Sequence, residues 1–111
     1  MKLPKMPGGN MMKQLQDAME RMQALEQELQ DARLEVSAGG GMVQATFSGT
    51  GEMVAIKINR DVVDPDDVEM LEDLVLSAVR EGALKASQLR EERTAEIQSM
   101  LPQVPGMQMP F

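Results

Sequence analysis

The chain has 111 residues and a formal net charge of -7, and it contains no histidine, cysteine, tryptophan or tyrosine. This length fits one domain with a single modest core. The missing residue types exclude a disulfide framework, a thiolate metal site and a histidine proton shuttle. The only aromatic residues, Phe47 and Phe111, are too few for a platform that stacks unpaired bases.

The remaining side chains also argue against catalysis and against a membrane partner. An enzyme would depend on serine, lysine and carboxylates alone, and no base, nucleophile and orienting group converge in the sequence. We therefore expect no enzyme activity, no cofactor and no small-molecule substrate. The first 15 residues lack the apolar core of a signal peptide, and no apolar run approaches the ~18 residues of a membrane span. The sequence predicts a soluble, cytoplasmic protein.

Residues 10–33 have the pattern of a long amphipathic helix. Leu15, Met22, Leu29 and Val36 recur every seven residues, and the segment is rich in Gln, Glu, Met, Leu and Ala, which favour helices. Asn10 is the expected N-cap. The adjoining stripe contains Met12, Ala18, Met19, Leu25 and Ala32. Most of the twelve methionines are expected to fill gaps in such packing.

From residue 43 the apolar period changes from helical to alternating. Val43, Ala45 and Phe47 alternate with polar residues, and a second alternating run, 54–58, follows "GTGE". This pattern predicts a hairpin with one buried face. The extended segment "RLEVS" and the turn "AGGG" precede it, so three short antiparallel strands are expected. A phosphate cradle is disfavoured because these glycines open into a strand and not into a helix.

The stretch "DVVDPDDVEMLED", residues 61–73, holds seven carboxylates and no base, so the rest of the chain is formally neutral. Asp64 as N-cap, Pro65 in the first turn and carboxylates at the positive end of the dipole predict a helix start. A calcium loop is the alternative, but its glycine and distal glutamate are missing. An apolar face then continues as far as Ile97, before Pro102.

The predicted fold class is α+β: long helix, three-stranded antiparallel sheet, long helix. We expect a flexible N-terminal segment at residues 1–9, a single α-β-β-β-α domain at residues 10–100 and a tail rich in proline and methionine at residues 101–111. A three-stranded sheet with one apolar face covers only part of two long helices and leaves its edges unpaired. A second copy of the chain is the simplest cover, which predicts a homodimer.

These ordered features resemble the YbaB/EbfC family of small bacterial nucleoid-associated proteins. The likeness is carried by "GGNMMKQLQDAMERMQALEQEL", "VSAGGGMVQATFSGTGEMVAIKI", "DPDDVEMLEDLVLSAVREGALKA" and the end "GMQMPF", and it covers nearly the full length. The resemblance implies a homodimer joined at its sheet region, with helices projecting like the arms of tweezers. It further implies binding to double-stranded DNA, a location in the nucleoid and effects on gene expression. In the hairpin turn, "GTGE" stands where a more polar or basic stretch is common in the family.

An acidic protein that binds DNA must keep its bases away from its acids, because affinity depends on neutralising phosphates. Lys2, Lys5 and Lys13 precede the first carboxylate, Asp17, so the N-terminal end is locally cationic. The candidate DNA-binding residues are therefore Lys2, Lys5, Lys13, Arg90 and Arg93, with Arg80 and Lys85 as intermediate candidates. The alternative for each base is a solvated surface charge paired with a neighbour, for example Arg21 with Asp17 at helical spacing.

A second function remains open at this stage. The chain could be an acidic, methionine-rich adaptor that offers helix grooves to replication or recombination proteins, with only indirect effects on DNA. Steep salt dependence of duplex binding would favour DNA contact, whereas apolar groove binding depends little on salt. Arg, Lys, Asn and Gln are the side chains left that could read base edges, and those on the helices belong to amphipathic helices whose apolar faces are committed to packing. We therefore expect binding with little sequence specificity.

Overall fold

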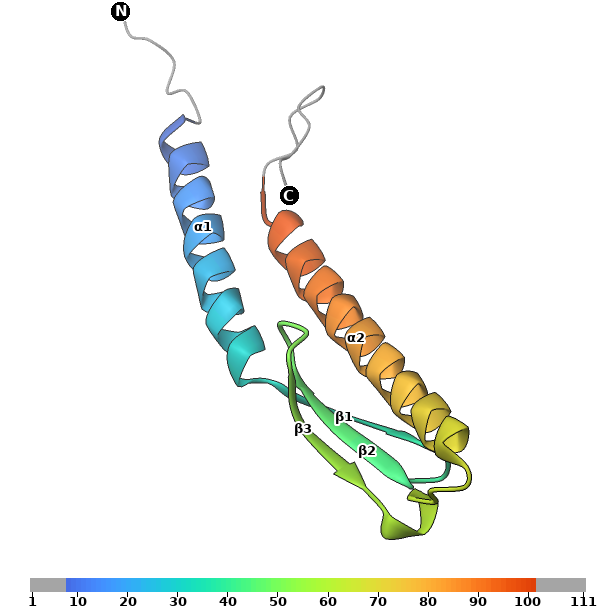
Figure 1. Ribbon diagram of the computed structural model, residues 1–111. Helices are drawn as coiled ribbons and strands as arrows, with labels where there is room; N and C mark the ends of the chain where they lie inside the picture. Colours follow the sequence, from blue (N-terminus) through green and yellow to red (C-terminus); the bar gives the residue numbers. More distant parts are fainter. Residues whose placement is uncertain (1–7, 102–111) are drawn as a thin grey trace, which may run out of the picture.

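The computed structural model describes residues 8–101 and shows an elongated α+β chain, as predicted (Figure 1). In chain order the elements are α1 (Gly8–Asp31), β1 (Arg33–Ala38), β2 (Val43–Ser48), β3 (Met53–Ile58), the short 3-10 helix η1 (Arg60–Val62) and α2 (Val68–Gln98). Residues 1–7 and 102–111, most of the expected N-terminal segment and C-terminal tail, lie outside the described part. Neither helix within residues 8–101 combines the length and apolarity that crossing a bilayer requires.

Helix α1 differs from the sequence prediction at both ends. It begins at Gly8, so Asn10 lies in its first turn and is not the N-cap that the sequence suggested. It ends at Asp31, and Val36 belongs to strand β1 and not to the helical stripe. The seven-residue spacing of Val36 therefore has no structural meaning, because the chain has already changed to an extended conformation at Arg33.

The three strands form one antiparallel sheet in the order β1-β2-β3. Val36 pairs with Ala45, and Ala45 pairs with Ile56, so these residues share the face that α2 covers. Helix α2 packs on β1 and β2. Val43, Ala45 and Phe47 of β2 are buried as the alternation predicted, whereas every residue of β3 is exposed.

Small residues on α2 let it lie close to strand β2. Ala78, Gly82 and Ala86 are buried on this helix, and a Cβ atom built on Gly82 would overlap the ring of Phe47. The Phe47 side chain is only 3% exposed, so its ring has little room to move. The absence of a side chain at Gly82 therefore makes the room that the Phe47 ring occupies.

The start of α2 lies three residues later than predicted. Asp67, not Asp64, is the N-cap, and its carboxylate accepts a hydrogen bond from the amide of Met70 at 3.3 Å. The Asp64 carboxylate accepts from the amide of Asp66 at 2.9 Å, which is a local turn typical of aspartate. The carboxylate that the sequence assigned to the helix is thus used by the turn before it.

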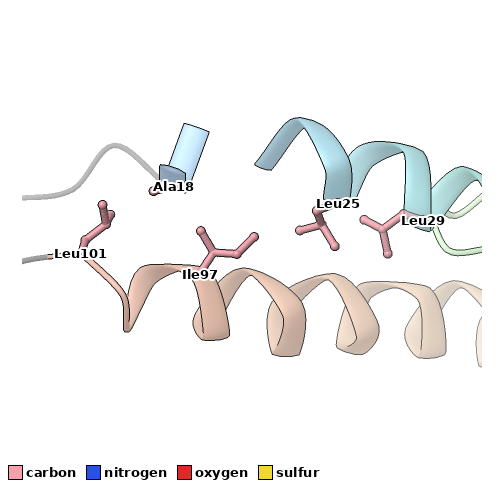
Figure 2. Close-up of a cluster of buried hydrophobic side chains, with 5 residues drawn as sticks. All are labelled: Ala18, Leu25, Leu29, Ile97 and Leu101. Atoms are coloured by element: carbon pink, nitrogen blue, oxygen red, sulfur yellow. The ribbon is translucent and has the colours of Figure 1, made fainter. Parts of the chain in front are cut away.

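The buried side chains form two separate clusters. The sheet cluster consists of Val36, Val43, Ala45, Phe47 and Ala78. The arm cluster joins α1 to the end of α2, and Figure 2 shows Ala18, Leu25 and Leu29 of α1 facing Ile97 and Leu101. We call α1 together with the C-terminal part of α2 the arm, because Figure 1 shows both extending away from the sheet.

Replacing Gly82 with alanine should destabilise the protein. Alanine gains about 1 kcal/mol of helix propensity over glycine, but its methyl group would collide with the buried Phe47 ring, and overpacking typically costs about 1–3 kcal/mol. We expect the collision to outweigh the propensity, measured as a lower free energy of unfolding in urea. Ser87→Ala at an exposed site of the same helix is the control and should not destabilise. A more stable Gly82→Ala variant would show that α2 does not approach β2 this closely.

Candidate nucleic-acid interface

The acidic stretch and the arm tip lie at opposite ends of the molecule. Residues 61–73 form the end of η1, the turn after it and the start of α2, beside the sheet. The first turns of α1 and the last turns of α2 lie toward the other end of the molecule, where α1 extends further than α2 (Figure 1). Asp67 and Arg90 are separated by about 35 Å of helix, from the rise of 1.5 Å per residue. The separation that the charge pattern predicted is therefore present in the fold.

The described DNA-binding candidates lie at different positions along the molecule. Lys2 and Lys5 lie outside the described residues. Lys13 is exposed on α1, near the arm tip, and Arg90 and Arg93 lie on the part of α2 that packs against α1. Arg80 and Lys85 are exposed on the part of α2 beside the sheet.

Arg90 and Arg93 are both engaged in ion pairs that join the two helices of the arm. Arg90 donates a hydrogen bond from Nη1 to Oε1 of Glu26 at 2.5 Å, and Arg93 lies 3.2 Å from Glu28. Arg93 also lies 3.6 Å from Glu96, one turn along α2. The hydrogen bond and positive charge of Arg90 lower the pKa of Glu26, and the hydrogen bond from Arg90 to Glu26 raises the pKa of Arg90. We call the two interhelical pairs, Arg90 with Glu26 and Arg93 with Glu28, the arm clasp.

The clasp could not be predicted from sequence spacing. Arg90 and Glu26 are 64 residues apart, and the pattern pointed instead to a local pair of Asp17 with Arg21. That expected pair is not among the ion pairs of the described residues. Lys13 likewise makes no ion pair within residues 11–101.

Two other lysines, Lys57 and Lys85, line an open groove on the sheet. The groove has a volume of about 730 Å³, and Lys57 and Lys85 line it together with Glu35 and Glu81. Lys85 donates from Nζ to the backbone oxygen of Glu35 at 3.3 Å. The sequence prediction did not include Lys57, although its polar position in the alternating strand could have indicated it. Two carboxylates balance the two lysines, so the groove is not a cationic surface.

The described carboxylates do not form a metal site. Among residues 8–101 no cluster of three or more acidic side chains has an arrangement that could hold a metal ion. Two of the acids of residues 61–73 instead accept local backbone hydrogen bonds, Asp64 in the turn before α2 and Asp67 at the start of the helix.

An apolar surface lies beside the sheet, at the free edge formed by β3. The large apolar residues of this strand are each 38–45% exposed; they are Met53, Val54, Ile56 and Ile58. A nearly apolar hollow of about 390 Å³ lies on α2, lined by Leu71, Glu72, Val75, Leu76 and Val79. No other element of the described chain covers either feature.

The clasp should weaken at low pH. Because the folded-state pKa of Glu26 is lowered, the pair contributes stability above the ordinary glutamate pKa and loses it as pH falls through the lowered value. The difference in thermal stability between the native chain and Glu26→Gln should therefore shrink as pH is lowered from 7 to 3. Glu92→Gln, on the exposed side of α2, serves as the control and should show no such change. An equal difference at both pH values would mean that the clasp does not form.

Comparison with known proteins identifies the family. The family described as the YbaB/EbfC DNA-binding family matches residues 5–101. A nucleoid-associated protein of Thermoanaerobacter pseudethanolicus is 45% identical over 105 residues, which cover 91% of this chain and 94% of the relative. One from Thermodesulfovibrio yellowstonii is 46% identical over 99 residues, covering 89% and 86%. The crystal structure of an uncharacterized Helicobacter pylori protein shares the fold, with a TM-score of 0.69 and 23% identity over 88% of this chain and 99% of that one. The chain belongs to the YbaB/EbfC DNA-binding family.

Proposed function

We propose that this protein binds double-stranded DNA as a homodimer, with little sequence specificity, and acts in the bacterial nucleoid, where it affects nucleoid organisation and gene expression. The observation that carries the proposal is the family match, which spans α1, the sheet and α2 and ends where the described chain ends, at residue 101. Relatives that match most of the chain are named nucleoid-associated proteins. None of these relatives is described as an enzyme or as a protein-binding adaptor, so the adaptor alternative gains no support.

The arm tip is the end of the molecule best suited to phosphate. Along α2 the carboxylates from Asp67 to Asp73 lie about 26–35 Å from Arg90, whereas the Debye length at physiological salt is about 8 Å. These acids therefore do little to repel a duplex held at the tip. Lys13 is exposed there, and Lys2 and Lys5 precede it in the chain. Flexible lysines suit phosphate contacts that carry no sequence information.

Arg90 and Arg93 are weaker candidates than the lysines, because their guanidinium groups already contact Glu26 and Glu28. A phosphate would have to compete with these carboxylates. Their side chains are nevertheless 40% and 42% exposed, so a phosphate can approach without moving either helix. We assign them a secondary contact, made by exchange of the carboxylate for phosphate.

The homodimer is proposed to form at β3. An exposed, apolar edge strand pairs readily with another strand, and natural proteins normally cover such an edge. Two β3 strands related by a two-fold axis would give a continuous six-stranded sheet and cover the apolar residues of β3. The arms of both copies would then remain uncovered and accessible to DNA.

The dimer prediction is tested by a charge on β3. Ile56→Lys places an ammonium group in the proposed apolar interface, where burying it without a partner is costly. We expect sedimentation at micromolar concentration to show a dimer for the native chain and a lower mass for this variant. Lys57→Gln, on the neighbouring position and the opposite face, is the control and should remain dimeric. A native chain that sediments as a folded monomer would exclude this interface.

The DNA prediction is tested by removing the N-terminal lysines. The variant with Lys2, Lys5 and Lys13 replaced by glutamine should bind any duplex more weakly. The slope of log affinity against log salt should shrink by about 0.9 for each phosphate that the variant no longer neutralises, counted over both subunits. The measurement is a titration against two unrelated duplexes at low and moderate salt, in which the native chain should not discriminate between them.

Two control variants locate the effect. Lys57→Gln with Lys85→Gln removes positive charge from the sheet groove and should leave the salt slope nearly unchanged. Neutralising Asp66, Asp67 and Glu69 should also leave the slope unchanged, but should destabilise α2 by a few tenths to ~1 kcal/mol for each charge at the helix dipole. Unchanged affinity and slope in the N-terminal variant, with the dimer still folded, would exclude the arm-tip interface.

A further inference from the structure

The two edges of the sheet differ in what borders them. Strand β1 lies at one edge and β3 at the other (Figure 1). Helix α2 packs on β1, and Val36 of that strand is buried in the sheet cluster, whereas every residue of β3 is exposed. Edge strands offer unpaired backbone groups to another chain. If both edges were open, copies could add on both sides without limit, so the state of β1 determines where assembly stops.

The direction of the backbone groups on β1 follows from the hydrogen bonds of its neighbour β2. The amide of Ser48 donates to the backbone oxygen of Glu52, just before β3, at 2.8 Å. Because alternate residues of a strand direct their backbone groups to the same side, Thr46 of β2 also faces β3. The partner of Thr46 on β1 is Glu35. The backbone N–H and C=O of Glu35 therefore point away from β2, out of the edge of the sheet.

The same alternation describes the edge formed by β3. Gln44 of β2 directs its backbone groups to its partner Lys57, so Ile56, the residue before Lys57, directs its own groups outward. The side chain of Ile56 is apolar and this residue is 41% exposed. Within residues 8–101 no side chain hydrogen-bonds to the backbone of β3. Nothing in this part of the chain therefore prevents another strand from pairing with β3.

On β1, by contrast, the outward backbone oxygen is already bonded. Lys85, exposed on α2, donates a hydrogen bond from Nζ to the backbone oxygen of Glu35 at 3.3 Å. A strand that paired here would have to take this oxygen from the lysine and displace its ammonium group. Where β1 begins, Arg33 donates from Nη1 to the backbone oxygens of Gln30 and Ala32, at 2.8 and 2.9 Å. A second cation therefore lies at the start of the same strand.

The charge of Glu35 also opposes pairing at β1. Its carboxylate is exposed, and two β1 strands related by a two-fold axis near this residue would place two carboxylates opposite each other. Like charges in directly opposite positions of a sheet are destabilising. Lysine is a common means of blocking an edge strand, because its long stem reaches the backbone while its ammonium group stays in water.

We propose that Lys85 closes the β1 edge of the sheet, so that two copies join through β3 and no third copy can add. The contact with the backbone oxygen of Glu35 is the observation that carries this inference. The limit of two copies rests on the β3 dimer of the proposed function, whereas the closure of β1 does not. Helix α2 thus determines which edge of the sheet remains available.

A background without the Glu35 charge isolates the effect of the lysine. Glu35→Thr removes the carboxylate, adds a residue that favours strands and keeps the backbone oxygen that Lys85 binds. In sedimentation over a range of micromolar concentrations, this variant should match the native chain. Adding Lys85→Met, which has no donor and no charge, should give masses above the native value that rise with concentration. Equal masses with and without Lys85→Met would overturn the proposal. Growth of the Glu35→Thr chain alone would also overturn it, because the carboxylate would then close the edge.

A second background separates β1 from β3. Ile56→Lys blocks the proposed β3 interface, so in a chain that carries it together with Glu35→Thr, Lys85→Met opens β1 alone. The mass should then rise to that of two copies and no further. No rise in mass would overturn the closure of β1, even where the native chain is a dimer. A native chain that is a folded monomer would exclude the β3 dimer, and the same rise would still show that Lys85 closes β1.

Two substitutions in the Glu35→Thr background serve as matched controls. Arg80 is also exposed on α2, so Arg80→Met removes one positive charge and adds the same apolar side chain at another position of this helix. Lys85→Arg keeps a charged donor of similar reach. Both chains should have the mass of the Glu35→Thr variant, with an unchanged urea midpoint as evidence of an intact fold. Growth of either control would overturn the proposal, because the effect would not depend on the contact that Lys85 makes.

Discussion

The close approach of α2 to strand β2 at Gly82 and Phe47 sets the position of the rest of the chain. Helix α2 is continuous for 31 residues, so the angle at which its first half lies on the sheet also sets the direction of its second half. The first half contributes Ala78 to the sheet cluster, and the second contributes Ile97 to the arm cluster. One helix thus serves two cores that are separate from each other, and the contact at Gly82 orients both.

The position of α1 depends on its packing against α2 and on one backbone contact with the turn after β2. The amide of Gly49 donates to the backbone oxygen of Leu29 at 2.7 Å, and a Cβ atom on Gly49 would lie 2.8 Å from that oxygen. This close backbone contact anchors the end of α1 at the turn after β2. Beyond it, α1 depends on the arm cluster and the clasp. The exposed ion pairs of the clasp contribute little stability by themselves, so Leu25, Leu29 and Ile97 supply most of the packing.

Much of the fold could be predicted because the spacing at which apolar residues recur can be read from a short stretch of sequence. Alternation at Val43, Ala45 and Phe47 identified the buried strand, and the helical pattern identified both long helices. The N-cap of α2 could not be assigned in this way. Asp64 and Asp67 both have a side chain able to cap, and Asp64 precedes a proline that is typical of a helix start. The outcome depends on the turn in which Asp64 bonds Asp66, a feature of the folded backbone.

The candidate site was less predictable, because the environment of a charge depends on residues distant in sequence. The pattern indicated that the acidic stretch, residues 61–73, is distant from Arg90 and Arg93, and α2 does separate them. It did not show that Arg90 and Arg93 face Glu26 and Glu28 across the arm, since helix packing alone brings these residues together. It also did not show how much of the apolar pattern of α1 remains exposed. Met12 and Met19 fit the pattern as well as Leu25, but only Leu25 lies opposite α2.

The distance between the acidic stretch and the arms bears on the proposed binding of a polyanion at the arms. Acids at the start of α2 stabilise that helix end through its dipole and keep the region next to the sheet negative. A duplex that approaches this end meets seven carboxylates and is repelled, whereas the arm tip lies several Debye lengths away. The net charge of the chain therefore does not oppose binding uniformly. It disfavours the end beside the sheet, which is why we propose the arms as the phosphate-binding part of the molecule.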